Sequence, residues 1–306
     1  MNKIKLTEDL FIYESIKEEA EKISRPSFTY WQDAFRRFKA NKLVVGAFIL
    51  LLIMIFLAVV VPIFSRYNYH QQDFNCINKW PSWEHFFGTD DLGRDLFVRC
   101  WEGARVSLFI GIMAAFINGG LGIIYGGLSG FLGGTIDMIM MRFVEIIISI
   151  PQLLWIILLI LIMKPGIWPI IIAISATGWV QTARIFRGQV LQIRETEYVM
   201  ASKIFRASNL WIIYKHLLPN AISPILINLT FIIPSAIFAE AFLSYIGLGL
   251  PLPMASWGNL AAGGASVIFI YPYQLFSPAL LISITMLSFN IIGDGLRDAF
   301  DPKFRI

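Results

Sequence analysis

The chain has 306 residues, of which 57% are hydrophobic and only 15% are charged. Soluble globular proteins carry charge on about a quarter of their residues, so a soluble domain of this length could not bury so much apolar surface. The apolar residues also form long blocks, which predicts an all-α membrane protein with several spans.

The lysines and arginines are distributed unevenly around these blocks. Nine lie in residues 1–42, six in 181–221 and three after Gly293, whereas 248–277 contains none. The positive-inside rule therefore predicts that the N-terminus, the segment around 195–220 and the C-terminus are cytosolic. Because the basic residues flank apolar blocks and form no separate basic domain, no nucleic-acid partner is expected.

Residues 1–42 form a polar N-terminal arm. Its last part is amphipathic and aromatic, which fits a helix lying on the membrane surface or a solvated helix leading into the first span. Residues 43–64 contain no charge. At about 1.5 Å per residue, they are long enough to cross roughly 30 Å of hydrocarbon.

An external loop is expected from 65 to 103. It contains "GTDDLGRD" (88–95), whose three aspartates could suggest a metal site. The glycines of this stretch favour a structured surface loop instead, and the histidines of the chain are scattered without ligand spacing. Cys76 and Cys100 both fall in the predicted loop, where two separate thiols are favoured over a disulfide.

The second span is expected to start near Arg105. Four glycines recur at every fourth position: Gly122, Gly126, Gly130 and Gly134. This spacing predicts close packing of another helix, or a bend out of the membrane near Gly130. A phosphate-binding loop is not indicated, because no Lys-Ser/Thr follows the glycines.

A third span is expected over 138–163. Arg142 and Glu145 are spaced to pair on one helix face, and Pro151 predicts a kink. The fourth span is short in apolar residues, so its helix is expected to continue through 181–194 into the cytosol.

The fifth span begins after Pro219-Asn220, and the last covers 277–293, which gives six spans. Glu240 lies near the outer end of the fifth, where it is a functional candidate or an interfacial residue touching water. The stretch 244–274 is rich in Gly, Pro and aromatics and is expected to be re-entrant or interfacial.

Residues 195–220, here called the elbow, connect the fourth and fifth spans. Most of them favour helix, with apolar side chains near one face at i, i+3 and i+7. Ser208-Asn209 predicts a turn or the cap of a second short helix, and Pro219 is expected to stop or redirect it. The sequence therefore predicts a helix-turn-helix at the cytosolic surface, stiff enough to transmit a push to both spans.

The stretch "ETEYVMASKIFRASNL", followed by "KHLLPN", resembles the EAA-type coupling loop of bacterial ABC importer permeases. "HFFGTDDLGRDLF" (85–97), "SWGN" (256–259) and "GDGLRDAFDP" (293–302) narrow the resemblance to the C-type permease of the dipeptide/oligopeptide/nickel branch. The resemblance extends over nearly the whole chain from about Trp31. It implies a type I ABC importer permease fold, with six transmembrane helices and both termini cytosolic.

Three positions depart from the family pattern. Met200 replaces the usual glutamate, Ser202 replaces the second alanine, and Arg206 replaces the glycine before Ala-Ser. Because that glycine eases the turn between the two helices, Ser208-Asn209 is expected to supply the turn instead. The departures suggest a subunit tuned to its own ATPase.

The resemblance divides the chain into a cytosolic arm (1–42), a first span with its external loop (43–103) and a five-helix core (104–306) with the coupling loop at 195–220. It implies a non-catalytic subunit of the bacterial plasma membrane. Its partners would be a second homologous permease, two ABC ATPases that use ATP and Mg, and an extracellular or periplasmic binding protein. No cofactor or metal is expected on this chain.

The residues expected to couple to the ATPases are Glu197, Tyr198, Ala201, Ser202, Lys203, Phe205, Arg206, Ala207, Ser208, Asn209, Leu210, His216, Leu218, Pro219 and Asn220. Among them, Phe205 and Leu210 are expected to enter the ATPase cleft, with Lys203 and Arg206 as a charged rim and Pro219-Asn220 as a hinge. Polar residues in or near the spans are candidates for the substrate path: Asn118, Asn228, Glu240 and Asn290.

Peptides are the expected substrate and nickel is the alternative within the branch. A stand-alone channel or secondary transporter would account for six spans but not for the elbow. A membrane enzyme is disfavoured, because the sequence offers no histidine cluster and no nucleophile-base spacing.

Overall fold

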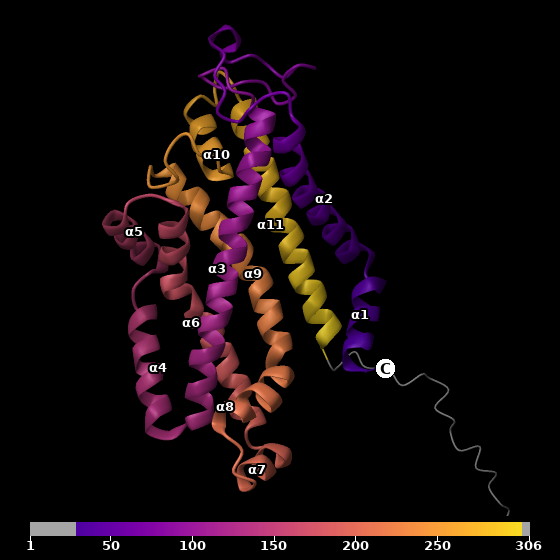
Figure 1. Cartoon of the computed structure of the whole chain (residues 1–306), viewed down its shortest axis with the longest axis vertical. Coiled ribbons are helices and arrows are strands. Elements are labelled where there is room, and N and C mark those ends of the chain that lie inside the picture. The colour runs from indigo at the N-terminus through magenta and orange to yellow at the C-terminus, as the bar shows by residue number, and fades with distance from the viewer. Residues whose placement is uncertain (1–28, 302–306) are drawn as a thin grey trace, which may run out of the picture.

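The computed structural model describes residues 29–301, and helices form nearly all of its regular structure (Figure 1). The helices are α1 (Tyr30–Ala40), α2 (Lys42–Phe64), a 3-10 turn (Phe74–Cys76), α3 (Leu96–Leu132), α4 (Gly134–Ile148), α5 (Gln152–Met163), α6 (Ile167–Ile193), α7 (Glu197–Ile204), α8 (Asn209–Ile212), a π turn (Ile213–Leu217), α9 (Leu218–Tyr245), α10 (Trp257–Ser266) and α11 (Tyr273–Phe300). The expected all-α class is confirmed.

Five of the described helices are long and apolar enough to cross a membrane: α2, α3, α6, the continuous helix that contains α9, and α11. The pair α4 and α5 meets the same criterion together but is bent by 80°. The bend confirms the kink predicted at Pro151, since a proline ring disrupts the helix before it. Counting the bent pair as one span gives the six predicted spans.

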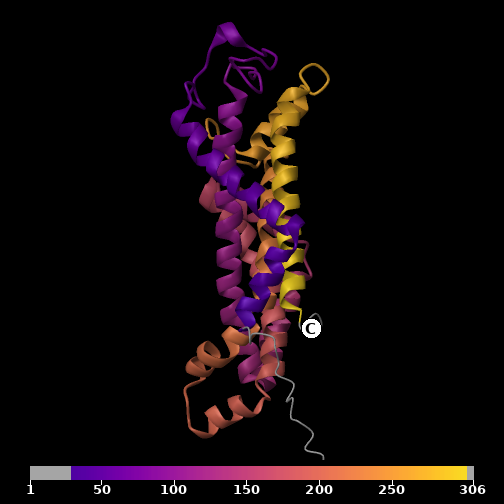
Figure 2. The same cartoon turned by 90° about the vertical axis from the view of Figure 1, so that its right-hand side faces the viewer.

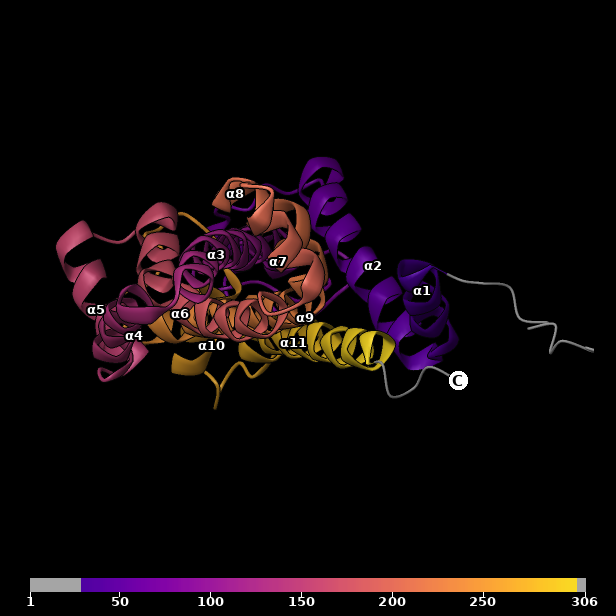
Figure 3. The same cartoon turned by 90° about the horizontal axis from the view of Figure 1, so that it is seen from below.

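Seen from below, α3, α6 and α9 lie side by side at the centre, with α4 and α5 on one side and α1 and α2 on the other (Figure 3). Along the long axis, the 65–95 loop and α10 lie at one end, whereas α7 and α8 project from the opposite end (Figures 1 and 2). The C-terminal end of α11 points toward the elbow end and packs against α1, where the rings of Trp31 and Phe300 are 5.6 Å apart.

Three of the four regularly spaced glycines bring α3 against α6. A Cβ added to Gly122 or Gly126 would lie 2.5 or 2.2 Å from atoms of α6, and one added to Gly130 would lie 3.0 Å away. These distances confirm the predicted close packing. Gly134 takes no part, because it follows the end of α3 with φ +57° and nothing within 4 Å.

The helix of the second span begins earlier than the sequence predicts, at Leu96 rather than near Arg105. Asp95 caps it by accepting a main-chain N–H of the first turn at 2.9 Å. The charged residues Arg99, Glu102 and Arg105 concealed this start. Arg99, for example, donates to a main-chain oxygen of the preceding loop (3.0 Å). Consequently the loop ends at Asp95, and Cys100 lies inside α3; both cysteines are free thiols.

The 65–95 loop is ordered, as its glycines predict. Gly88 and Gly93 have φ of +76° and +69°, and a Cβ on either would collide with main-chain oxygens. Asp90 and Arg94 form an ion pair at 2.6 Å. In residues 29–301, no group of three or more His, Cys, Asp or Glu side chains could hold a metal ion.

Candidate coupling elbow and membrane cavity

The elbow is anchored to the bundle by a buried apolar cluster. Val199 of α7, Ile212 of α8 and Leu217 of the π turn are fully buried. They pack with Phe186 and Val190, which lie near the end of α6. Because α6 continues as one helix to Ile193, as predicted, the cluster joins the elbow directly to a membrane span.

The far side of the elbow is apolar and exposed. Ile204, Phe205 and Tyr214 have exposed fractions of 80, 85 and 75%. Large side chains this exposed at the tip of an ordered element are typical of a surface that another protein covers. The sequence indicated Phe205 but missed Ile204 and Tyr214, since helical periodicity alone does not show which face remains uncovered.

The turn between α7 and α8 falls at residues 205–206, and Arg206 itself adopts the left-handed conformation with φ +56°. The expectation that Ser208-Asn209 would supply this turn is therefore wrong. Ser208 instead caps α8, where its Oγ accepts the N–H of Trp211 at 3.3 Å. A residue with a Cβ in this left-handed conformation costs roughly 1–2 kcal/mol relative to its ordinary backbone conformation.

His216 joins the two arms of the elbow. Its ring lies 5.7 Å from that of Tyr198 and 5.1 Å from that of Trp211. Ser202 Oγ donates to the Tyr198 carbonyl (2.9 Å) and lies 3.3 Å from His216 Nε2. Since the hydroxyl proton is already donated, the contact requires His216 Nε2–H as the donor. The serine that replaces an alanine therefore adds a polar link inside the elbow.

Pro219 does not stop the helix, because α8, the π turn and α9 are continuous. The alternative that Pro219 redirects the helix stays a prediction. In an α-helix its ring would clash with the carbonyl four residues earlier. The π turn before it, in which Leu218 N–H bonds to Ile213 O, widens the helix there. Asn220 Nδ2 then donates to the His216 carbonyl at 2.6 Å.

An ion pair and a hydrogen bond to the main chain connect the C-terminal part of α6 to α4 and α3. Arg187 Nη2 donates to Asp137 of α4 at 2.6 Å, and Asp137 also bonds Ser129 of α3. Arg194 Nη1 donates to the main-chain oxygen of Gly130 at 2.9 Å. The end of α6 that leads into the elbow is therefore linked to α3 and α4 by polar contacts.

The predicted coupling residues Glu197, Tyr198, Ala201, Arg206 and Asn209 are exposed on the elbow, whereas Ala207 and Leu218 pack against the buried cluster. The side chains of Lys203 and Leu210 lie outside the described set.

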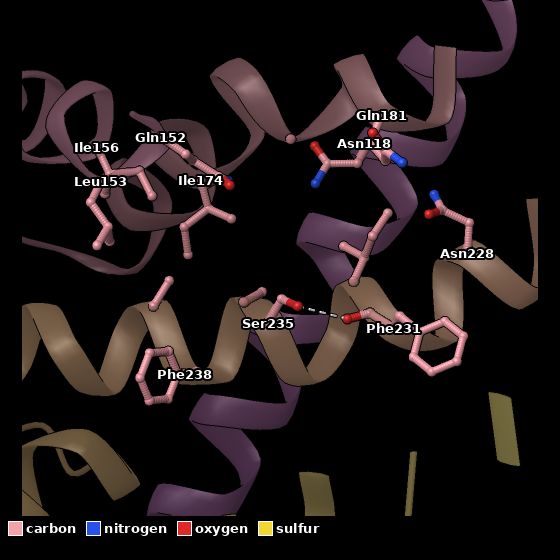
Figure 4. A pocket seen from close by; sticks show the side chains of 14 residues that line it. Asn118, Gln152, Leu153, Ile156, Ile174, Gln181, Asn228, Phe231, Ser235 and Phe238 are labelled. Atoms are coloured by element: carbon pink, nitrogen blue, oxygen red, sulfur yellow. Dashed lines mark hydrogen bonds between the residues drawn. The ribbon is translucent and has the colours of Figure 1, made fainter. Parts of the chain in front are cut away.

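A cavity of about 380 Å³ lies between α3, α5, α6 and α9 (Figure 4). Its lining consists of Asn118, Gln152, Leu153, Ile156, Ile174, Gly178, Gln181, Asn228, Phe231, Ile232, Ser235, Ala236, Phe238 and Ala239. It brings together two of the predicted path residues, Asn118 and Asn228, whereas Glu240 and Asn290 do not line it. Gln152 and Gln181 were missed, because each sits at an end of an apolar block and resembles an interfacial residue.

Glu240 is fully buried, which rules out the interfacial alternative. Its carboxylate accepts hydrogen bonds from the hydroxyls of Ser107 (3.2 Å), Ser244 (3.0 Å) and Ser256 (2.7 Å). Ser256 is the N-cap of α10. Glu240 thus fastens the start of α10 to α3 and α9.

Comparisons with known proteins agree with these features. Residues 120–306 match the family described as the binding-protein-dependent transport system inner membrane component. Residues 29–81 match the N-terminal transmembrane domain of oligopeptide transport permease C.

Curated relatives resemble the chain over almost their whole length. The oligopeptide permease OppC of Bacillus subtilis is 50% identical, covering 94% of each chain, and the dipeptide permease DppC of the same strain is 51% identical, covering 94% of this chain and 90% of the relative. OppC of Escherichia coli K12 is 38% identical over 95% of this chain and 97% of the relative.

An inward-facing structure of the MetNI methionine ABC transporter shares the fold. It aligns with a TM-score of 0.54 at 19% identity, covering 67% of this chain and 96% of that chain.

Proposed function

The chain belongs to the family of binding-protein-dependent transport system inner membrane components, and on that basis we propose that it forms half of a peptide import path in the bacterial plasma membrane. A second, homologous permease would complete the path. Two ABC ATPases would use ATP and Mg to drive it, and an extracellular or periplasmic protein would deliver the peptide. The chain itself catalyses no reaction.

The exposed tip of the elbow is the observation that carries the proposal. Ile204, Phe205 and Tyr214 face outward, while the opposite side of the elbow is buried against α6 and α9. An ATPase that covers the tip gains apolar contact, and the buried cluster transmits its movement to both spans. Closure of the ATPase pair would then tilt the spans between inward-open and outward-open states.

The substrate path is proposed to run through the cavity that Asn118 and Asn228 line. Glu240 and Asn290 are left out of the path, because neither side chain lines this space. The elbow is proposed to face the cytosol, and both termini are proposed to lie on the same side of the membrane, which accords with the lysines and arginines that flank the apolar blocks.

The test compares two exposed phenylalanines at opposite ends of the molecule. Phe205→Asp places a charge on the elbow tip, whereas Phe269→Asp changes a fully exposed residue between α10 and α11. We expect Phe205→Asp to reduce ATPase co-purification at least tenfold and Phe269→Asp to leave it within twofold. Equal ATPase recovery from both variants would contradict docking at the elbow.

The substrate is tested in a strain that lacks the gene, complemented with the wild-type chain. Uptake of labelled tripeptides is compared with uptake of nickel, the alternative within the branch. Restored tripeptide uptake supports the proposal, and restored nickel uptake alone would favour the alternative.

A further inference from the structure

The polar groups of the cavity are all uncharged. Four carboxamides line it, each from a different position in the bundle: Asn118 from α3, Gln152 from α5, Gln181 from α6 and Asn228 from α9. A hydroxyl, that of Ser235, completes the polar set, and none of the fourteen lining residues carries a charge. In Figure 4 the amides of Asn118, Gln181 and Asn228 lie in the space between α6 and α9.

Asn118 is unusual because its side-chain amide is buried but not fully hydrogen-bonded. Its side chain is 1% exposed, and its Oδ1 has no hydrogen-bond partner among the described residues. A Cβ on Gly178 would lie 2.3 Å from Asn118 Nδ2, so only a glycine at that position lets the amide lie against α6. Because buried acceptors are normally satisfied, the free Oδ1 points to a ligand that supplies a donor.

The main chain of a peptide presents the groups that a carboxamide can satisfy. Each peptide bond has one N–H donor and one carbonyl acceptor, and each carboxamide offers both an acceptor and donors. Main-chain groups that cross hydrocarbon without partners are strongly disfavoured. Carboxamides remove this penalty without a net charge, so they do not discriminate between acidic and basic side chains.

We propose that this cavity binds the main chain of the peptide during transport, an inference that rests on the proposed function. Asn118 Oδ1 accepts a peptide N–H, and Gln152, Gln181 and Asn228 contact neighbouring peptide groups. The uncharged lining lets peptides of either charge pass.

The test introduces charge into the cavity without a change of shape. Gln152 and Gln181 are exposed, so Gln152→Glu and Gln181→Glu avoid burying a carboxylate in the core. Gln189→Glu is the matched control, since Gln189 lies on the same helix as Gln181 but does not line the cavity. Uptake of Ala-Lys-Ala, Ala-Glu-Ala and Ala-Ala-Ala is measured in cells with the complete transporter. The binding protein is the same throughout, so a change in the ratio reports on the permease.

We expect Gln152→Glu and Gln181→Glu to raise the ratio of Ala-Lys-Ala to Ala-Glu-Ala uptake at least tenfold, and Gln189→Glu to leave it within twofold of wild type. An unchanged ratio in both cavity variants, at normal complex yield, would overturn the inference, and so would an equal shift in the control. Failure of the wild-type transporter to take up any of the three peptides would instead refute the proposed function. As a second readout, Asn118→Leu is expected to lower uptake of all three peptides at least fivefold while leaving ATPase co-purification unchanged.

Discussion

The contact between α3 and α6 at Gly126 provides the sharpest test of the packing. A Cβ at this position would lie 2.2 Å from the main-chain oxygen of Ala183, and ordinary contact requires at least 3.4 Å. One helix must therefore move by about 1 Å, and overpacking of this kind costs about 1–3 kcal/mol. Gly120, six residues earlier on the same helix, has nothing within 4 Å of the added atom. Gly120→Ala should therefore gain up to ~1 kcal/mol of helix propensity.

The assay is the midpoint of thermal unfolding of each variant in detergent. We expect Gly126→Ala to unfold at a lower temperature than wild type, and Gly120→Ala at the same or a higher temperature. Because the clash is with a main-chain atom, Ala183→Gly should not rescue Gly126→Ala. Equal midpoints for the two alanine variants, or rescue by Ala183→Gly, would refute the proposed main-chain contact.

Two further predictions concern the elbow and the buried carboxylate. Arg206→Gly removes the strain of a non-glycine residue in the left-handed conformation and should stabilise the elbow by up to about 1 kcal/mol. We expect slower amide hydrogen exchange in α7, and faster exchange would contradict the left-handed conformation of Arg206. Glu240→Ala removes the acceptor of three serine hydroxyls and should cost about 2–5 kcal/mol in thermal unfolding. Glu145→Ala is the control, since the ion pair of Glu145 with Arg142 (2.7 Å) is exposed and should contribute less than ~0.5 kcal/mol. A similar loss of stability in both variants would show that the hydrogen bonds of Glu240 do not stabilise the fold.

The spans could be predicted from the sequence because hydrocarbon thickness imposes a length on every apolar block. Residues 43–64 and the kink at Pro151 follow from this constraint and from proline geometry. The start of α3 at Leu96 could not be predicted in the same way. The charges of Arg99, Glu102 and Arg105 interrupt the apolar block, so these turns look like a loop until the hydrogen bond from Arg99 to the preceding segment is known.

The candidate sites were only partly predictable, because they depend on which helix faces meet. The elbow could be recognised from local helix propensity and from its motif. Neither source shows that Arg206 keeps the left-handed turn or that helix continues through Pro219. Likewise, Gln152 and Gln181 join Asn118 in one cavity only because α5 folds back beside α6 after the 80° bend.

Both the elbow and the cavity involve helices α6 and α9, so a movement at one site is transmitted to the other through these helices. Phe186 and Ile225 belong to the buried cluster under the elbow, whereas Gln181 and Asn228 line the cavity. At ~1.5 Å per residue, the two sites lie only about 5–8 Å apart along α6 and α9. Asn228 Nδ2 also donates to Thr182 of α6 at 2.9 Å, so the helices are joined between the sites. A displacement of α6 against α9 at the elbow must therefore strain or break this hydrogen bond and change the spacing of the cavity amides, with no flexible segment between to absorb it.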